Sequence, residues 1–200
     1  MSSVPTKRYT PQEYLELERK AETKSEYYRG EIFAMSGASR VHNLLAGNLF
    51  ALIWSQLRGR PCVVFSSDMR VKVDWSGLYT YPDLSALCGE PEFDDEQLDT
   101  LLNPNLLIEV LSPSTEDYDR GGKFELYRQI PSLQDYVVVA QDRVFVEHHT
   151  RSDDGSWRLV DYRSPDDELL LKSIDCRLRL AEVYERVEFA SGEDESTQGN

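Results

Sequence analysis

Two acidic residues of the chain stand where a carboxylate needs a compensating partner. Glu109 interrupts the apolar run LLIEVL at residues 106–111, and a buried carboxylate is costly unless it is paired, metal-bound or protonated. Asp83 follows Pro82 at the start of the run DLSALC, so its carboxylate can face solvent or a metal at the end of a sheet. If these two strands are neighbours, both carboxylates can converge on one cation. Mg²⁺, which is usually held by one or two carboxylates with water and substrate phosphate, is the expected ion, and Mn²⁺ is an alternative.

Lys123 supplies a third element of the same chemistry. It opens the helical segment KFELYRQI, one turn before Tyr127 on the same face. The segment follows the Glu109 strand through SPSTEDYDRGG, so Lys123 should lie near the end of that strand. Two carboxylates, a divalent ion and a lysine suit hydrolysis of a phosphodiester. The metal lowers the pKa of its bound water, and the lysine orients that water or stabilises the transition state.

The elements that would position these residues indicate an α/β fold. Thr10 is a predicted N-cap, with Glu13 completing a capping box, so we expect a helix over residues 11–22. SEYYRGEIFAMSG predicts a hairpin, and Ser39 can cap a second helix. Strands are expected in CVVFS, MRVKVD, DLSALC, the Glu109 run and DYVVVA, and Pro113 should break the Glu109 strand. A helix is expected over residues 121–129, followed by closing antiparallel strands. This order predicts a mixed sheet covered on both sides.

Length and composition fit one domain over residues 1–190, followed by a disordered acidic tail at 191–200. No apolar run is long enough to span a membrane, and the first residues lack the apolar stretch of a signal peptide, so we expect a cytoplasmic protein. The three cysteines are widely spaced and form no CxxC pair, which indicates neither a disulfide framework nor a zinc site. The adjacent His148 and His149 should point to opposite faces of a strand, so they make a poor metal site and are expected at the surface.

The charge is unevenly distributed along the chain. A net charge of −14 argues against a protein that coats nucleic acid by bulk attraction. Residues 33–73, however, carry a local balance of +4, and the acids gather elsewhere, above all in EPEFDDEQLD. The basic segment is compatible either with a local phosphate-binding groove or with scattered solvated charges.

Four stretches of the chain form a specific combination of motifs: GEIFAMSGASRVHNLLAGNL, YPDLSALCGEP, NPNLLIEVLSPST and DRGGKFELYRQIPSLQDYVVV. Together they closely resemble the Uma2 family of endonucleases within the PD-(D/E)XK superfamily. The resemblance spans nearly the whole chain. It implies a restriction-endonuclease-like mixed sheet flanked by helices, Mg²⁺ dependence and cleavage of nucleic acid, with Asp83 and Glu109 as the two acids and the Val110 carbonyl as a further metal ligand.

One departure from the superfamily pattern concerns the lysine. The pattern places it two residues after the second acid, but that position here is Leu111, and Lys123 resembles the migrated replacement found in this branch. Four further residues are candidates by position. Glu26, near the hairpin, is a candidate for a further acid of the metal site. His42, near the start of the second helix, is a candidate for a catalytic residue or a phosphate contact. Arg40 and Tyr127 are substrate-binding candidates.

The leading interpretation is a Mg²⁺-dependent endonuclease that cuts DNA, and enzymes that cut both strands commonly work as C₂ homodimers. A second interpretation is a catalytically weak nuclease-fold module that binds nucleic acid or a protein partner. A third is a structural protein whose Glu109 merely pairs with an arginine. The intact acidic pair favours the first.

Overall fold

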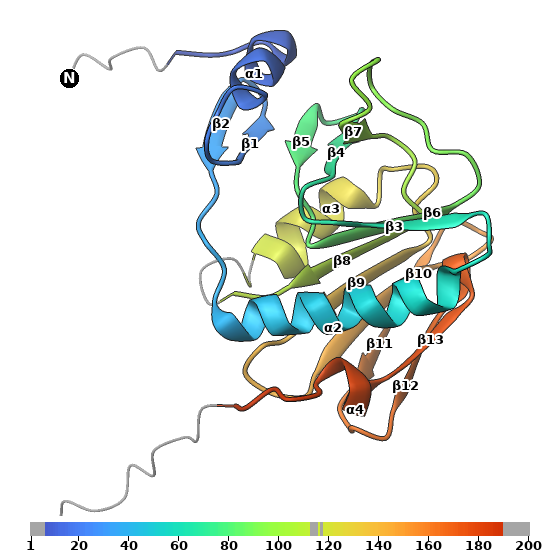
Figure 1. The fold of residues 1–200 in the computed structure, drawn as a ribbon. Helices are drawn as coiled ribbons and strands as arrows, with labels where there is room; N and C mark the ends of the chain where they lie inside the picture. The colour runs from blue at the N-terminus through green and yellow to red at the C-terminus, as the bar shows by residue number, and fades with distance from the viewer. Residues whose placement is uncertain (1–6, 113–115, 117, 190–200) are drawn as a thin grey trace, which may run out of the picture.

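A six-stranded mixed sheet, seen in Figure 1, positions both candidate carboxylates. Glu109 lies within one of its strands, and Asp83 directly precedes another. The computed structural model describes residues 7–112, 116 and 118–189, so the predicted tail at 191–200 and the predicted strand break at Pro113 lie outside the described residues. In spatial order the strands of this sheet are β11 (Trp157–Tyr162), β10 (Val146–Arg151), β9 (Asp135–Val139), β8 (Leu106–Val110), β6 (Leu84–Cys88) and β3 (Cys62–Ser66). Within this sheet β8 and β9 run parallel, and the other neighbouring strands are antiparallel.

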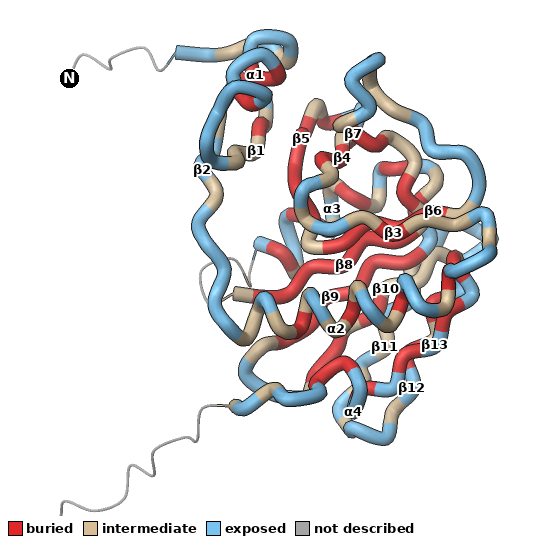
Figure 2. The backbone as a smooth tube through the Cα atoms, viewed as in Figure 1, coloured by how far each residue is buried: buried red, intermediate tan, exposed pale blue. Residues whose placement is uncertain are grey.

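The two faces of this sheet belong to two different cores. Residues 106, 108 and 110 of β8 pack with helix α2 (Arg40–Leu57), whereas Leu107 and Leu111 pack with Tyr127 on the opposite side. The strands β8 and β9 are buried along their whole length (Figure 2). Since side chains alternate along a strand, Glu109 points to the same side as Leu107 and Leu111. Its carboxylate therefore lies between sheet and helix α3 (Phe124–Tyr127), which supplies Tyr127.

The N-terminal part begins with the predicted capping box. Helix α1 (Pro11–Glu18) starts at Thr10, whose side chain accepts from the Glu13 amide while the Glu13 carboxylate accepts from the Thr10 amide. The hairpin of β1 and β2 turns at Arg29 and Gly30, both with positive φ, as a tight two-residue hairpin turn requires. These strands belong to a five-stranded sheet in the order β2 (Glu31–Ala34), β1 (Ser25–Tyr28), β5 (Leu78–Thr80), β4 (Arg70–Val73) and β7 (Thr100–Leu101).

The C-terminal part closes the α2 side of the large sheet. Strands β12 (Glu168–Leu171) and β13 (Cys176–Arg179) form a two-stranded sheet, joined by a short 3₁₀ turn and followed by helix α4 (Leu180–Val183). Their buried side chains belong to the same core as those of α2. Together these layers confirm the predicted mixed α/β sheet with helices on both sides (Figure 1).

One predicted helix differs in form. The helix expected over residues 121–129 consists of a π-helical segment, Tyr118–Lys123, which continues into α3 and ends at Tyr127. π-Helical turns are rare and occur frequently at functional sites.

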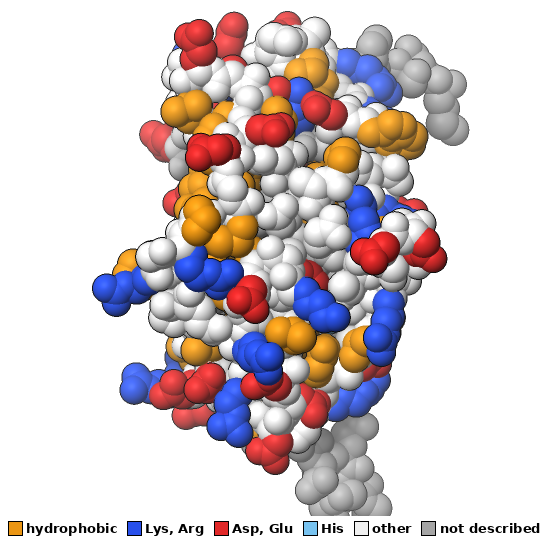
Figure 3. Space-filling view, turned by 90° about the vertical axis from the view of Figure 1, so that its right-hand side faces the viewer, with side chains coloured by type: hydrophobic (Ala, Val, Ile, Leu, Met, Phe, Trp, Pro, Cys, Tyr) orange, Lys and Arg blue, Asp and Glu red, His pale blue; other side chains and the backbone are white. Residues whose placement is uncertain are grey.

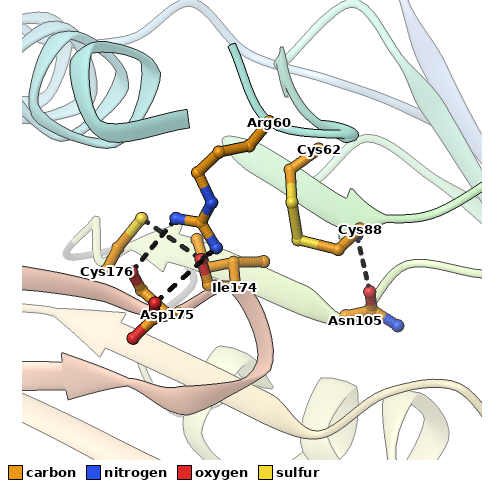
Figure 4. Close-up of a disulfide and its surroundings, with 7 residues drawn as sticks. All are labelled: Arg60, Cys62, Cys88, Asn105, Ile174, Asp175 and Cys176. Carbon is orange, nitrogen blue, oxygen red and sulfur yellow. Dashed lines mark hydrogen bonds and ion pairs between the residues drawn. A yellow bond between two sulfur atoms is a disulfide. The ribbon is translucent and has the colours of Figure 1, made fainter. Parts of the chain in front are cut away.

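Cys62 and Cys88 form a disulfide, which the sequence did not indicate (Figure 4). They face each other across β3 and β6 with their Cα atoms 3.9 Å apart. The expectation of no disulfide was wrong because the pairing follows from strand register and not from cysteine spacing. Cys176, in contrast, is a buried free thiol near Arg60, which donates to the backbone carbonyls of Ile174 and Asp175 (Figure 4).

The disulfide argues against the expected cytoplasmic location, because such bonds are rare in a reducing cytoplasm. Over the described part of the chain, no helix combines the length and the apolar character that crossing a bilayer requires.

The disulfide predicts a specific pattern of thiol labelling. In denaturant without reductant, iodoacetamide should modify Cys176 alone, whereas all three cysteines should react after reduction. Mass spectrometry of the intact protein counts the adducts. Cys62→Ser is the control, since it frees Cys88 and adds a second reactive thiol without reductant. Modification of all three cysteines in the unreduced protein would contradict the bond.

The two histidines of β10 lie on opposite faces, as predicted, but His148 is not at the surface. It is 4% exposed, and its Nε2 lies 2.6 Å from Oδ1 of Asp135. The ring of His149 packs on Phe124 with centroids 4.1 Å apart. The expectation that these histidines lie at the surface was wrong because β10 lies inside the sheet, between β9 and β11. Burial lowers the pKa of His149 to about 4, and the charge of His148 lowers it further.

This lowered pKa predicts a pH dependence of stability. The unfolded chain takes up a proton at His149 near pH 6.5, and the folded protein only near pH 4, so protonation should destabilise the fold as the pH falls through that window. The free energy of unfolding of wild type, measured by urea titration, should therefore decline more between pH 7 and 4 than that of His149→Phe, which keeps the ring contact. Equal declines in the two proteins would refute this assignment.

Candidate active site

Strand register brings Asp83 and Glu109 to the same end of the sheet. Leu84 pairs with Ile108 in the antiparallel ladder of β6 and β8, so the next step outward places Asp83 opposite Glu109. The backbone amide of Val110 donates to Oδ2 of Asp83 at 2.7 Å, which fixes the aspartate against β8. The charge of Asp83 also contributes to raising the pKa of Glu109, as expected for two neighbouring carboxylates.

Glu109 is held by two donors from the helical side of the sheet. Its Oε1 accepts from the Tyr127 hydroxyl at 2.8 Å and lies 3.1 Å from Nζ of Lys123. The residue is 4% exposed, and burial raises the pKa of its carboxyl, although the charge of Lys123 acts in the opposite direction. Glu109 is thus a carboxylate whose ionisation depends on the cations beside it.

Lys123 joins three carboxylates in a nearly closed site. Its Nζ lies 3.1 Å from Glu109, 3.1 Å from Asp119 and 3.6 Å from Glu26. Burial acts to lower the pKa of the ammonium, but the negative charges of these three residues outweigh it and raise the pKa of Lys123 well above its ordinary value. Lys123 therefore keeps its proton at neutral pH.

His42 approaches the site from the first turn of α2. Its Nε2 lies 3.1 Å from Oδ2 of Asp83, the same oxygen that accepts from Val110. Burial acts to lower the pKa of His42, yet the hydrogen bond and charge of Asp83 prevail and raise it, with the Val110 backbone adding to the effect. His42, Asp83 and Val110 thus form one half of the site.

Glu26 reaches the other half from the β1–β2 hairpin. The Thr80 hydroxyl donates to Oε1 of Glu26 and lies 3.3 Å from the hydroxyl of Tyr127. This chain of contacts ties the N-terminal sheet to the Glu109 strand. Tyr127 is fully buried, which favours a role in holding Glu109 over the substrate contact expected from the sequence.

The structure brings together most of the residues singled out in the sequence. Asp83, Glu109, Lys123, Glu26, His42, Val110 and Tyr127 meet at one end of the large sheet. Arg40 does not join them through any described contact and is exposed at the first residue of α2. Asp119 was not among these site candidates, yet its carboxylate contacts Lys123 with the i, i+4 spacing that a helical segment allows. Thr80 was missed, and its sequence context gives no sign of this role.

Two cations at the C-terminal end of the basic segment at residues 33–73, Arg70 and Lys72, are not available for the compatible phosphate groove. Arg70 is 2% exposed and bonds Asp99, Thr100 and Tyr81. Lys72 pairs with Asp94 at 2.6 Å, so the acidic loop neutralises both of these cations. On the face in Figure 3, Lys and Arg side chains are interspersed with Asp and Glu, and its described residues form no continuous basic stripe.

The donor set suits a hard divalent cation of the Mg²⁺ type. Over the described residues, no three or more His, Cys, Asp or Glu side chains are grouped as a metal site would need, so protein side chains alone do not complete a cage. Mg²⁺ does not require one, because it is commonly bound by one or two carboxylates and keeps several waters. The four contacts of Asp83 and Glu109 with His42, Val110, Lys123 and Tyr127 use one oxygen of each carboxylate. The pair therefore fits such an ion.

Comparison with known proteins places this arrangement in a family. The model of the Uma2 family, described as "Putative restriction endonuclease", matches residues 11–181. The chain belongs to the Uma2 family. A Synechocystis relative named "Uncharacterized protein slr1290" is 38% identical over 187 residues, covering 94% of this chain and 97% of the relative. Another, "Uncharacterized protein sll1609", is 39% identical over 169 residues, covering 84% and 96%.

A crystal structure from Anabaena variabilis shows the same Uma2 architecture. It is titled a "putative nuclease belonging to DUF820" and superposes with a TM-score of 0.73 at 20% identity, covering 88% of this chain and 97% of that one. At this identity the likeness establishes the fold. The expected family and the restriction-endonuclease-like fold are both confirmed, and together they support a nuclease.

The Lys123 cluster predicts a strong coupling between Lys123 and Glu109. Lys123→Ala leaves three carboxylates without their ammonium and should lower the free energy of unfolding by about 3–5 kcal/mol in chelator-treated protein. Adding Glu109→Gln should recover part of that loss, because a neutral amide needs no cation. Urea unfolding of wild type, both single variants and the double variant measures the coupling. Losses that simply add would show that the two groups are energetically independent.

Proposed function

We propose that this Uma2 protein is a divalent-metal-dependent endonuclease that hydrolyses phosphodiester bonds in DNA. The observation that carries the proposal is that strand register sets Asp83 opposite Glu109 at one end of the sheet, beside a buried lysine that keeps its proton. Asp83 and Glu109 would hold the ion, with the Val110 carbonyl as a further ligand. Mg²⁺ is the expected ion, and Mn²⁺ would serve in the same site.

The ion, when bound, would lower the pKa of a water molecule and neutralise charge on the phosphate. The chain's own residues have separate tasks. His42 and the Val110 amide fix the Oδ2 of Asp83, while the Tyr127 hydroxyl fixes the Oε1 of Glu109. Because Lys123 holds its proton, it acts as an electrostatic donor to negative oxygen and not as a base.

In the reaction, a water oxygen would bond to phosphorus and the bond from phosphorus to one bridging oxygen would break. The attacking water gives up one proton and the leaving oxygen takes one up from solvent, so one water is consumed and a hydroxyl and a phosphate monoester result. Glu26 would orient the ammonium of Lys123 from the hairpin side. Arg40, which is exposed at the start of α2, would contact substrate phosphate outside the cluster.

Two alternatives have specific support. Glu109 pairs with a cation, as a purely structural role would require, although the cation is Lys123 and not arginine. The net charge of −14 favours a binding module over a nuclease that attracts DNA by bulk charge. Neither alternative explains why Asp83, Asp119 and Glu26 surround the same pair, since one carboxylate suffices to neutralise one lysine. A homodimer completes the proposal, whereas the Cys62–Cys88 bond weighs against the cytoplasmic location expected from the sequence.

The proposal predicts metal-dependent cleavage that requires both acids. With Mg²⁺ or Mn²⁺, wild type should cut plasmid or single-stranded DNA, while Asp83→Asn and Glu109→Gln should lose at least about 100-fold in rate, because removal of one positioned electrostatic group typically costs that much. Gel electrophoresis of the products measures the rate, and chelation should abolish it.

Glu125→Gln is the matched control, since Glu125 lies on α3 beside the site but its side chain is 66% exposed and pairs with Arg128. It should cut like wild type. Activity that survives in both acid variants would reject the site, and absence of cleavage by wild type on every substrate would favour the binding module.

A further inference from the structure

A cavity of about 520 Å³ opens beside the candidate active site. It lies between the N-terminal hairpin and the helical segment that carries Lys123, and its lining includes Glu26, Tyr28, Phe33, Tyr118, Gly122 and Leu126. Its volume falls in the range of about 300–1,000 Å³ that is typical of small-ligand sites. Nothing in the proposed hydrolysis uses these aromatic side chains.

The aromatic residues of this cavity are unusually open to solvent. Phe33 is 47% exposed and Tyr118 is 42% exposed, while Tyr28 is half-buried. Large apolar side chains gathered around one cavity, rather than scattered singly, indicate a binding surface. Their rings offer flat faces, and the branched aliphatic side chains of Leu78 and Leu126 complete the apolar lining.

Gly122 holds the ring of Tyr118 at the cavity wall. A Cβ atom at position 122 would lie 2.5 Å from Cδ2 and 2.8 Å from Cε2 of that ring, so any larger residue would displace it. The absence of a side chain at residue 122 thus lets the ring rest directly on the helical backbone. The wall is built by a specific glycine–tyrosine contact and is not a chance exposure.

The cavity is continuous with the catalytic groups. Glu26 lines it and lies 3.6 Å from Nζ of Lys123, which in turn lies 3.1 Å from Glu109. The same Nζ lies 6.0 Å from the centre of the Tyr118 ring. A ligand seated between the aromatic residues would therefore reach the phosphodiester-cleaving site with its neighbouring atoms.

We propose that this cavity binds one unpaired nucleobase of the substrate, next to the phosphate that is cut. The inference rests on the proposed function, which supplies the phosphodiester. Stacking of bases on aromatic side chains tolerates any sequence and is worth about 1–3 kcal/mol per base. The Glu26 carboxylate can accept from a base amino or imino group, as carboxylates do at base edges. A base inside a duplex cannot enter, so the substrate class is single-stranded nucleic acid or a site where a base leaves the stack.

The test measures binding without cleavage. A fluorescein-labelled single-stranded DNA oligonucleotide is titrated with the full chain in Ca²⁺, and a gel confirms that it stays intact; an abasic strand and a duplex of the same length serve as comparison ligands. Phe33→Leu and Tyr118→Leu keep the lining apolar but remove the rings. Trp54→Leu is the control, because Trp54 is 51% exposed on α2 and lies outside this cavity.

Both ring-removing variants should bind the base-bearing strand about 5- to 150-fold more weakly than wild type, in line with the stacking energy. Their binding of the abasic strand and of the duplex should not change, and Trp54→Leu should behave as wild type. Equal weakening for base-bearing and abasic strands, or none, would overturn the proposal. So would failure of wild type to bind the single strand, or a change of oligomeric state on Phe33→Leu with unchanged DNA binding, which would assign the cavity to a second copy.

Failure of this proposal is distinguishable from failure of the hydrolase proposal. If binding depends on both rings but wild type cuts no substrate, the base pocket stands and hydrolysis falls. If cleavage requires Asp83 but neither ring affects binding of the base-bearing strand, the pocket alone is rejected.

Discussion

The charge of Glu109 is the constraint around which the site is organised. Its strand is buried on both faces, and the carboxylate points into the side that packs against α3. A carboxylate there is tolerated because Lys123 and Tyr127 both bond it. The same ammonium also lies close to Asp119 and Glu26, so the cluster holds more carboxylates than one lysine can neutralise. A site that is dense in negative charge and closed on most sides follows from this one residue.

The same constraint explains why distant segments must dock for the site to form. Glu26 comes from the N-terminal hairpin, His42 from α2, Asp83 and Glu109 from neighbouring strands, and Lys123 from the helical segment after β8. Thr80 and Tyr127 link the two sheets by their hydroxyls. The acidic loop contributes at a distance, since Asp99 bonds both Arg19 and Arg70 and so holds α1 against β4. Part of the negative charge that argued against nucleic-acid binding is thus neutralised by arginines within the fold.

Much of the site could be predicted from the sequence because its signals are local. A carboxylate inside an apolar strand, an acid after proline at a strand start and a lysine on the following helix each stand out in a short window. Glu26 and His42 were recognisable as candidates for the same reason. Thr80, the Cys62–Cys88 bond and the burial of His148 could not be predicted, because each depends on which strands become neighbours and in what register. The π-helical form of Tyr118–Lys123 likewise has no sequence signature of its own.

The central claim is that Asp83 and Glu109 share one divalent ion. The most direct measurement is anomalous diffraction from crystals of the protein soaked in Mn²⁺, compared with crystals of Asp83→Asn treated in the same way. We expect one strong peak in bonding contact with both carboxylates in wild type, with Glu109 released from at least one of its present donors, and a lost or greatly weakened peak in the variant. A wild-type map with no peak between these side chains, while Lys123 still pairs with Glu109, would contradict the account.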